Sequence, residues 1–365
     1  MPSGRRSFYD TYARDLRAED VERLFTRDAR DAYEYFARGI DAEALRALPW
    51  YKRWPRHVRF FLVAFSLRLS PARRALFALS VILAVFGMLR IMAGMGPAPV
   101  VISLLLAYLL IMLEVADRVS LKGDLEVARE IQQAMLPNET FRLPAVSVRG
   151  FTRPANTVGG DFYDILPLPD GRLVVALGDV AGKGSPAALL MALLLAMLRT
   201  LVDEGLEAEA LVERLNGQIC RHSPPSRFIT LFYGVFDPRV GSLTYVNAGQ
   251  NPPLLRRSSG AYERLDSTGI ALGMFERSTY AARSITIEPS ELLVLYSDGI
   301  TEAEDKNGQP FDEAGLQRTV DEGPHDDPAA LGAAVLAAVE RHARDSRLAD
   351  DLTVLVLLRA EQAVA

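Results

Sequence analysis

The chain has 365 residues, enough for two or three domains of ordinary size and for a large buried core. Its 41 Lys and Arg residues and 46 Asp and Glu residues give a net charge of −5, which argues against a protein held to nucleic acid by phosphate contacts. The single cysteine, Cys220, excludes an internal disulfide and any cysteine cluster, and the four histidines are too far apart for a helical zinc motif, so a metal ion would need carboxylate ligands.

The N-terminal part is charged and has a helical pattern. Charged residues dominate residues 1–57, which fit short amphipathic helices, and the chain begins without the apolar core of a secretion signal. We therefore expect residues 1–70 to form a helical segment that stays in the cytoplasm.

Residues 71–116 hold the most apolar part of the sequence. Two apolar stretches, at about 75–95 and 98–115, each approach the roughly 20 residues that a helix needs to cross a bilayer, and a Gly-Pro turn separates them. This pattern predicts a hairpin of two transmembrane helices. Basic residues flank the hairpin and place both of its ends in the cytoplasm: Arg68, Arg73, Arg74, Arg118 and Lys122. We expect a multi-pass protein of the inner (cytoplasmic) membrane whose catalytic domain lies in the cytoplasm.

Two features bear on the number of spans. Arg90 interrupts the first stretch, so a pair of buried helices in a soluble domain is the alternative. A further apolar run, residues 187–198, has only 12 residues and is too short to cross a bilayer, which is typical of a core helix that covers a sheet. We therefore count two membrane spans.

Residues 117–137 are predicted to form a linker helix, ended by Pro137, between the hairpin and the next domain. A short heptad-like pattern runs along it, made by Leu121, Leu125, Ala128, Gln132 and Met135. The pattern favours a signalling helix, with a parallel homodimer as one arrangement. A solvated linker is the alternative, because Gly123 and Asp124 interrupt the pattern.

Residues 138–365 alternate short β-rich runs with helical stretches, which is typical of an α/β domain. Aspartates stand at the ends of several β-rich runs: Asp161, Asp179, Asp298, Asp350 and Asp351. One aspartate at such a place is more often a turn residue or a helix cap, but rigid strand ends can direct several carboxylates to one point. We expect these side chains to converge.

Carboxylates gathered in one place repel one another unless a cation neutralises them. Ligand sets made only of oxygen favour hard ions such as Mg²⁺ or Mn²⁺ over zinc. Two such ions about 3.5–4 Å apart promote hydrolysis of phosphate esters, because they lower the pKa of a bound water and neutralise developing charge. The aspartates therefore predict phosphoryl transfer to water, with two divalent metal ions as cofactors.

Four motifs follow one another in the sequence: GGDFYD at 159–164, GDVAGKG at 178–184, YSDGITEA at 296–303 and DDLTV at 350–354. With the preceding segment AREIQQAMLP at 128–137, they resemble the motif set of the bacterial SpoIIE/RsbU-type serine/threonine phosphatases, members of the metal-dependent protein phosphatase 2C superfamily. The resemblance covers about residues 125–359. It implies a β-sandwich of two antiparallel sheets flanked by helices.

The resemblance also implies a metal-binding set in which Asp179 bridges both ions. The other members are the side chains of Asp161, Asp298 and Asp350 and the carbonyl oxygen of Val180, with Asp351 replacing Asp350 if the register differs by one. Water then attacks phosphoserine or phosphothreonine directly, without a covalent enzyme intermediate.

Two further positions bear on the chemistry. Gln250 stands where the family often has His, so protonation of the leaving group is assigned to a metal-bound water. Lys183 is a candidate for binding the substrate phosphate, with an exposed structural lysine as the alternative.

The implied partner is a phosphorylated protein, in such families often an anti-sigma-factor antagonist whose dephosphorylation releases a sigma factor. Two other readings compete with the phosphatase. A diguanylate cyclase would share Gly159-Gly160-Asp161, but Phe162 stands where that family needs an acid. A non-catalytic membrane scaffold with a relic phosphatase fold is opposed by the presence of all four acids.

Overall fold

The computed structural model describes residues 50–224, 226–344 and 348–360. The chain divides into two compact units, residues 1–120 and 121–365. Most of the segment predicted as a cytoplasmic N-terminal region, residues 1–49, lies outside the described residues. We describe each unit by itself.

The first unit is a set of helices in which α6 (Pro71–Met92) and the start of α7 (Ala98–Met135) form a hairpin, preceded by α5 (Trp50–Arg68). The hydroxyl of Ser80 donates to the carbonyl of Ser103 at 3.1 Å, and the hydroxyl of Ser103 donates to the carbonyl of Ser80 at 2.8 Å. At Gly87, an added Cβ would lie 2.6 Å from Val100, so a small residue is needed where the helices approach closely.

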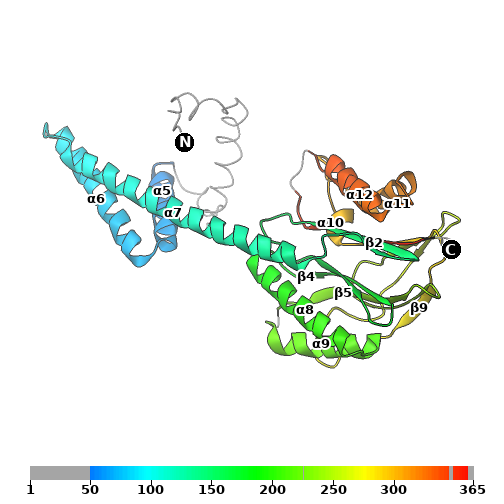
Figure 1. The fold of residues 1–365 in the computed structure, drawn as a ribbon. Coiled ribbons are helices and arrows are strands. Elements are labelled where there is room, and N and C mark those ends of the chain that lie inside the picture. Colours follow the sequence, from blue (N-terminus) through cyan, green and yellow to red (C-terminus); the bar gives the residue numbers. More distant parts are fainter. Residues whose placement is uncertain (1–49, 225, 345–347, 361–365) are drawn as a thin grey trace, which may run out of the picture. The chain divides into compact units, whose positions relative to one another are not determined.

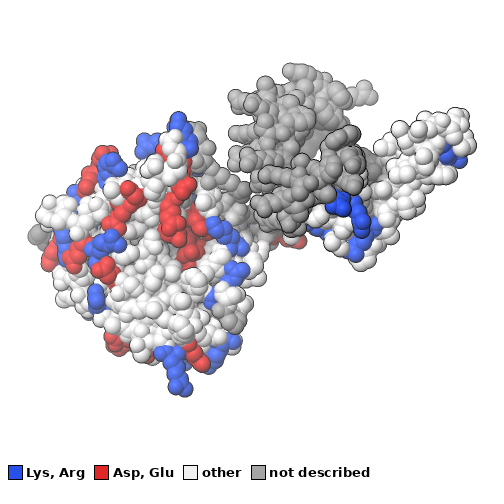
Figure 2. Space-filling view, turned by 180° about the vertical axis from the view of Figure 1, so that it is seen from behind, with Lys and Arg blue, Asp and Glu red and all other residues white. Residues whose placement is uncertain are grey.

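The surface of this hairpin is almost free of charged side chains except for basic groups toward its ends (Figure 2). By length and composition three described helices are able to cross a membrane: α6, α7 and α8 (Ser185–Asp203). The apolar face of α8 is covered inside the second unit, where Met191, Leu194 and Leu198 are fully buried. Helix α8 therefore serves as a core helix, whereas α6 and α7 expose most of their apolar side chains.

Helix α7 runs for 38 residues without interruption, so the second apolar stretch and the linker predicted at 117–137 are parts of one helix. Gly123 is tolerated because one glycine in a helix costs only about 1 kcal/mol relative to alanine. From Leu125 onward, the residues of the heptad-like pattern are partly or fully buried in the folded chain, so this face of α7 is covered without a second chain. Gln132 is 7% exposed, Met135 packs against the core of the second unit, and Leu121 stays exposed.

The second unit contains two antiparallel sheets. One has the strand order β1 (Phe141–Leu143), β2 (Val146–Arg153), β11 (Leu352–Arg359), β10 (Leu292–Tyr296), β7 (Leu254–Arg256) and β8 (Tyr262–Arg264). The other has the order β3 (Phe162–Pro167), β4 (Leu173–Val180), β5 (Ile229–Asp237), β6 (Ser242–Ala248) and β9 (Arg283–Thr286). The predicted fold, two antiparallel sheets flanked by helices, is confirmed.

The sheets pack face to face, and helices cover both outer faces (Figure 1). Helices α8 and α9 (Ala208–His222) cover the β3–β9 sheet, and α12 (Pro328–His342), with α11 (Asp312–Glu322) beside it, covers the other sheet. Successive side chains of β10 point to opposite faces of its sheet and so contribute to two hydrophobic cores. Leu293 and Leu295 point between the sheets, and Leu292, Val294 and Tyr296 pack under α11 and α12.

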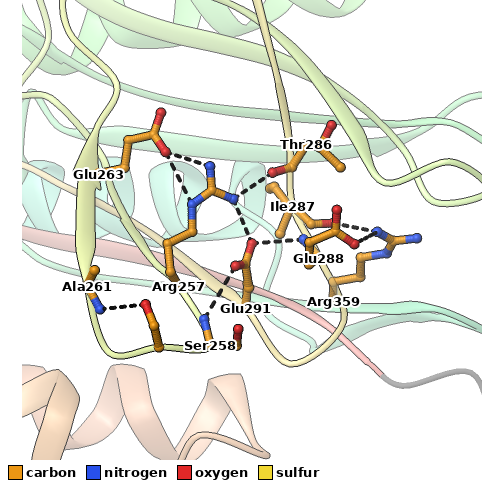
Figure 3. Close-up of polar contacts among 10 residues, drawn as sticks. Arg257, Ser258, Ala261, Glu263, Thr286, Ile287, Glu288, Glu291 and Arg359 are labelled. Atoms are coloured by element: carbon orange, nitrogen blue, oxygen red, sulfur yellow. Dashed lines mark hydrogen bonds and ion pairs between the residues drawn. The ribbon is translucent and has the colours of Figure 1, made fainter.

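A buried ion pair fixes the start of β10. Glu291 is 3% exposed, and one of its oxygens accepts from Arg257 Nη1 and from the backbone N–H of Glu288, both at 2.8 Å (Figure 3). Arg257 also donates to Glu263 and to the carbonyl of Thr286. A buried carboxylate needs such partners to remain charged, so this network pins the end of β10 that lies away from the aspartates.

Candidate metal centre

Sheet register brings the first two predicted aspartates together. Asp161 immediately precedes β3, and Asp179 is the next-to-last residue of β4. These strands are antiparallel and pair Phe162 with Gly178, so Asp161 and Asp179 lie opposite one another at the same sheet edge. Gly160 permits this approach, because an added Cβ would lie 2.9 Å from Asp179 Oδ1 and 2.8 Å from the Val180 carbonyl oxygen.

In the second sheet, Asp298 and Asp350 likewise lie at the ends of two neighbouring antiparallel strands, β10 and β11. Asp298 follows β10 and opens the short helix α10 (Asp298–Thr301), and Asp350 lies just before β11. These strands are also antiparallel, and the Ser297 hydroxyl accepts from the Thr353 N–H at 3.0 Å, which ties the two strand ends together.

The two pairs of aspartates are close enough to change one another's pKa values. Burial, followed by the negative charges of the nearby Asp298 and Asp350, raises the pKa of Asp179 to about 7. Burial, followed by the carboxylate of Asp179, raises the pKa of Asp161, with the hydroxyls of Thr353 and Ser297 opposing the increase. The four predicted carboxylates are thus neighbours that repel one another.

The pKa of Asp298 is also raised. Burial raises its pKa, and the charges of Asp350 and Glu302 add to the increase. The positive charge of Lys183 opposes the increase in this pKa. The structure therefore concentrates negative charge that the protein's own cations do not balance.

The donor set fits hard divalent cations. Asp161 is 4% exposed, and its Oδ2 atom is buried without a hydrogen-bond partner among the residues that the structure describes. A buried carboxylate oxygen with no proton donor is costly unless a cation contacts it. Carboxylate and carbonyl oxygens are the ligands that Mg²⁺ and Mn²⁺ prefer.

The side chains alone do not form a closed cage. Within the described part of the chain, no three His, Cys, Asp or Glu side chains are grouped as ligands of a single ion.

Asp351 has a different position from Asp350. Its two carboxylate oxygens accept from the backbone N–H groups of Ala155 at 2.8 Å and Gly160 at 2.7 Å. Asp351 therefore holds the loop before Asp161, whereas the oxygens of Asp350 contact the Asp351 N–H at 2.9 Å and the Lys183 ammonium at 2.8 Å.

Lys183 lies at the rim of the cluster. Its ammonium forms an ion pair with Asp350 at 2.8 Å and also donates to the carbonyl of Ala349. Hydrogen bonding to Asp350 raises the pKa of Lys183, so the side chain remains positive. Lys183 is therefore exposed and makes structural contacts, as the alternative of an exposed structural lysine describes, and its binding of a substrate phosphate stays a prediction.

Gln250 is buried and links the two sheets beside the aspartates. Its amide oxygen accepts from the hydroxyl of Thr230, the residue paired with Asp179, and its amide nitrogen donates to the carbonyl of Tyr296 at 3.2 Å. The residue thus links the start of β5, where Thr230 pairs with Asp179, to the end of β10, and neither contact involves proton transfer.

The sequence interpretation missed two groups that hold β3. Gln132 on α7 forms a reciprocal pair with Gly159, donating to its carbonyl at 2.8 Å and accepting from its N–H at 3.1 Å. Arg199 on α8 donates to Asp164 at 2.7 Å and to the carbonyl of Met135 at 2.6 Å. A polar residue within an otherwise apolar heptad pattern was the available signal for Gln132.

Comparison with known proteins supports the family resemblance. The family model described as Stage II sporulation protein E (SpoIIE) matches residues 169–360, a range that excludes Asp161. The chain is 33% identical over 238 residues to Protein IcfG from Synechocystis sp., covering 58% of this chain and 37% of that protein. It is 27% identical over 240 residues to phosphoserine phosphatase RsbU from Bacillus subtilis, covering 66% of this chain and 71% of that protein.

Solved structures support the fold. The SiaA-PP2C domain of Pseudomonas aeruginosa has a TM-score of 0.60 at 19% identity and covers 67% of this chain and 99% of that domain. The PP2C phosphatase domain of SpoIIE from Bacillus subtilis, solved with a fragment of its regulatory domain, has a TM-score of 0.52 at 20% identity, covering 60% of this chain and 64% of that one. The second unit therefore has a PP2C-like fold.

Proposed function

Because the chain belongs to the SpoIIE family, we propose that it is a membrane-tethered protein phosphatase that hydrolyses phosphoserine and phosphothreonine. The proposal is supported by the register that sets Asp161 opposite Asp179 at one sheet edge and by the carboxylates of Asp298 and Asp350, which raise the pKa of Asp179. The printed name of one relative, a phosphoserine phosphatase, supports the same reaction class.

We assign the four aspartates and the Val180 carbonyl to two divalent cations, Mn²⁺ or Mg²⁺. When bound, such a pair neutralises the phosphoryl group and supplies a water of lowered pKa for hydrolysis. The chain's own role is to fix the ligand directions. Gln250 ties the start of β5 to the end of β10. Asp351 holds the loop before Asp161, and Lys183 balances part of the charge on Asp350.

The proposed substrate is a phosphorylated partner protein, and an anti-sigma-factor antagonist is the class that family membership favours. Removing its phosphate would then release a sigma factor. We place the protein in the cytoplasmic membrane, with α6 and the first part of α7 as two spans and the second unit in the cytoplasm, because these helices expose long apolar faces.

Regulation through α7 is part of the proposal. Gln132 binds the backbone of Gly159, two residues before Asp161, so a rotation of α7 would displace a proposed metal ligand. A homodimer through this helix would use the exposed Val127 and Ile131, since the face that includes Gln132 is occupied by the chain's own second unit. A chain lacking residues 1–120 that keeps full-length activity and every response to stimuli would contradict this regulation.

The reaction is tested with the full chain in detergent micelles and a phosphoserine peptide as substrate. We expect inorganic phosphate to be released with Mn²⁺ or Mg²⁺ and release to stop with excess chelator. A matched serine peptide without phosphate is the control. Metal-loaded protein that releases no phosphate would favour a scaffold with a relic fold, and formation of a cyclic dinucleotide from GTP would identify a cyclase.

A further inference from the structure

An exposed apolar patch lies next to the proposed metal centre. It consists of Phe228, Met274 and Phe275, whose exposed fractions are 42%, 50% and 65%. Large apolar side chains grouped on the surface of a soluble unit often mark an interaction site, and aromatic residues dominate the energy of such sites. The three residues come from two segments, one leading into β5 and one between β8 and β9.

Buried polar contacts hold the patch in place. Asn216, fully buried on α9, accepts from the Gly273 N–H at 2.9 Å and donates to the Phe275 carbonyl at 2.9 Å. An added Cβ at Gly273 would lie 3.7 Å from Phe228 Cα, so the two segments touch. The loop is therefore fixed with Met274 and Phe275 facing outward, which limits the ordering cost of binding a partner.

Arg227 connects the patch to the metal centre. Its Nη1 donates to the carbonyl of Ala181 at 2.6 Å, and its guanidinium packs on Gly182. The Ala181 N–H in turn donates to the carbonyl of Phe228 at 2.9 Å, so Arg227 lies beside the loop that directly follows Asp179. No carboxylate forms an ion pair with Arg227 anywhere in the described residues, and most of its donors remain available.

We propose that a phosphoprotein substrate docks on this surface, with Arg227 receiving the phosphate and the apolar patch binding the polypeptide next to it. The inference rests on the proposed function and adds the residues that recognise its substrate. Arginine suits this role because its planar fork binds two phosphate oxygens at once. Continuity with the metal centre favours the substrate over other occupants, since a phosphate next to Asp179 would place its polypeptide along Phe228 and Phe275.

The test uses the full chain with two substrates, Mn²⁺ being present. Arg227→Gln is expected to raise KM about 10-fold for both p-nitrophenyl phosphate and phosphocasein, because both carry the phosphate. Phe275→Ser is expected to raise KM about 10-fold for phosphocasein alone, because p-nitrophenyl phosphate has no polypeptide. Val240→Ser, which changes an exposed apolar residue at the opposite end of β5, is the matched control and leaves both KM values unchanged.

Binding measured without turnover separates this inference from the proposed reaction. In excess chelator, labelled phosphocasein is expected to bind wild type more tightly than Phe275→Ser or Arg227→Gln. Dephosphorylated casein should retain the Phe275 effect and lose the Arg227 effect. If these differences appear while no substrate is hydrolysed with Mn²⁺, the docking surface stands and the proposed reaction fails.

Three results would overturn the inference. The first is that Arg227→Gln, with wild-type thermal stability, keeps wild-type KM and binding for phosphorylated substrates. The second is that Phe275→Ser and a Met274→Ser variant bind casein as wild type does. The third is that the Phe275 effect occurs in lipid nanodiscs but not in detergent micelles, which would assign the patch to lipid contact.

Discussion

The buried serines of the hairpin and the buried carboxylates of the metal centre differ in their hydrogen-bond partners. In the hairpin, Ser80 and Ser103 satisfy one another through reciprocal hydrogen bonds between α6 and α7. In the metal centre, Asp161 Oδ2 has no partner among the described residues, and neighbouring carboxylates raise one another's pKa values. The serine pair is therefore satisfied within the hairpin, although Arg90 Nε on α6 is buried without a hydrogen-bond partner among the described residues. The neighbouring carboxylates of the metal centre, in contrast, require a cation.

The largest expected effect comes from removing the central charge of the site. Asp179→Asn should lower metal-dependent turnover by about 1,000-fold or more, since the proposed bridging ligand is lost. Circular dichroism should show an intact fold, because the amide has nearly the same shape as the carboxyl group. Asp266→Asn, at an exposed aspartate, is the matched control and should keep full activity. Wild-type turnover by Asp179→Asn would show that the bridge is assigned to the wrong residue.

A smaller effect is expected from the contact between α7 and the loop before Asp161. Gln132→Ala should lower turnover by about 10–100-fold, the range for residues that orient metal ligands, and should also weaken Mn²⁺ binding. The neighbouring Gln133→Ala, at an exposed position of the same helix, should change neither quantity. Equal Mn²⁺ affinity in both variants would mean that Gln132 only stabilises the fold.

The hydrogen bonds between Ser80 and Ser103 are expected to affect the stability of the hairpin and not phosphatase turnover. Ser80→Ala should reduce the free energy of unfolding of the hairpin by about 1 kcal/mol, because the Ser103 hydroxyl and carbonyl lose one partner each. Phosphatase turnover at saturating Mn²⁺ should stay at the wild-type value. Unfolding in mixed micelles followed by helix content, beside an assay of phosphate release, checks both statements. If Ser80→Ala left the hairpin as stable as in the wild type but lowered turnover, the serine pair would act on the catalytic reaction rather than on stability.

The smallest effect is the pH dependence of stability without metal. Burial and like charge raise the folded-state pKa of Asp179 to about 7 and also raise that of Asp161, so the folded protein binds protons more tightly than the unfolded chain does. Stability from these groups is therefore present at low pH and is lost as pH rises through about 7. In chelator, Tm should fall from pH 5.5 to pH 8, and Mn²⁺ or Asp179→Asn should flatten this part of the profile. A Tm that rises over this range in wild type alone would contradict the assignment.

Much of the architecture can be predicted from the sequence, because the patterns that indicate it lie within short stretches of the chain. Apolar length predicts the helices α6 and α7, and β-rich runs ending in aspartate predict strands that end at the site. The sequence pattern separates the second apolar stretch at 98–115 from the linker at 117–137, whereas the structure joins them in the single helix α7. The roles of Gln132 and Gln250 were not predictable, since each side chain binds a backbone group distant in sequence.

The sequence by itself determined which chemical groups the protein has at its strand ends and how long its apolar helices are, because both follow from residue type and spacing along the chain. Tertiary structure decided which acid of the Asp350–Asp351 pair holds the loop before Asp161 and which face of α7 is covered. It also decided which cation packs on the loop after Asp179 without an acidic partner in the described chain. These features depend on contacts between segments far apart in sequence, and no local pattern encodes the sheet register and loop packing that create them.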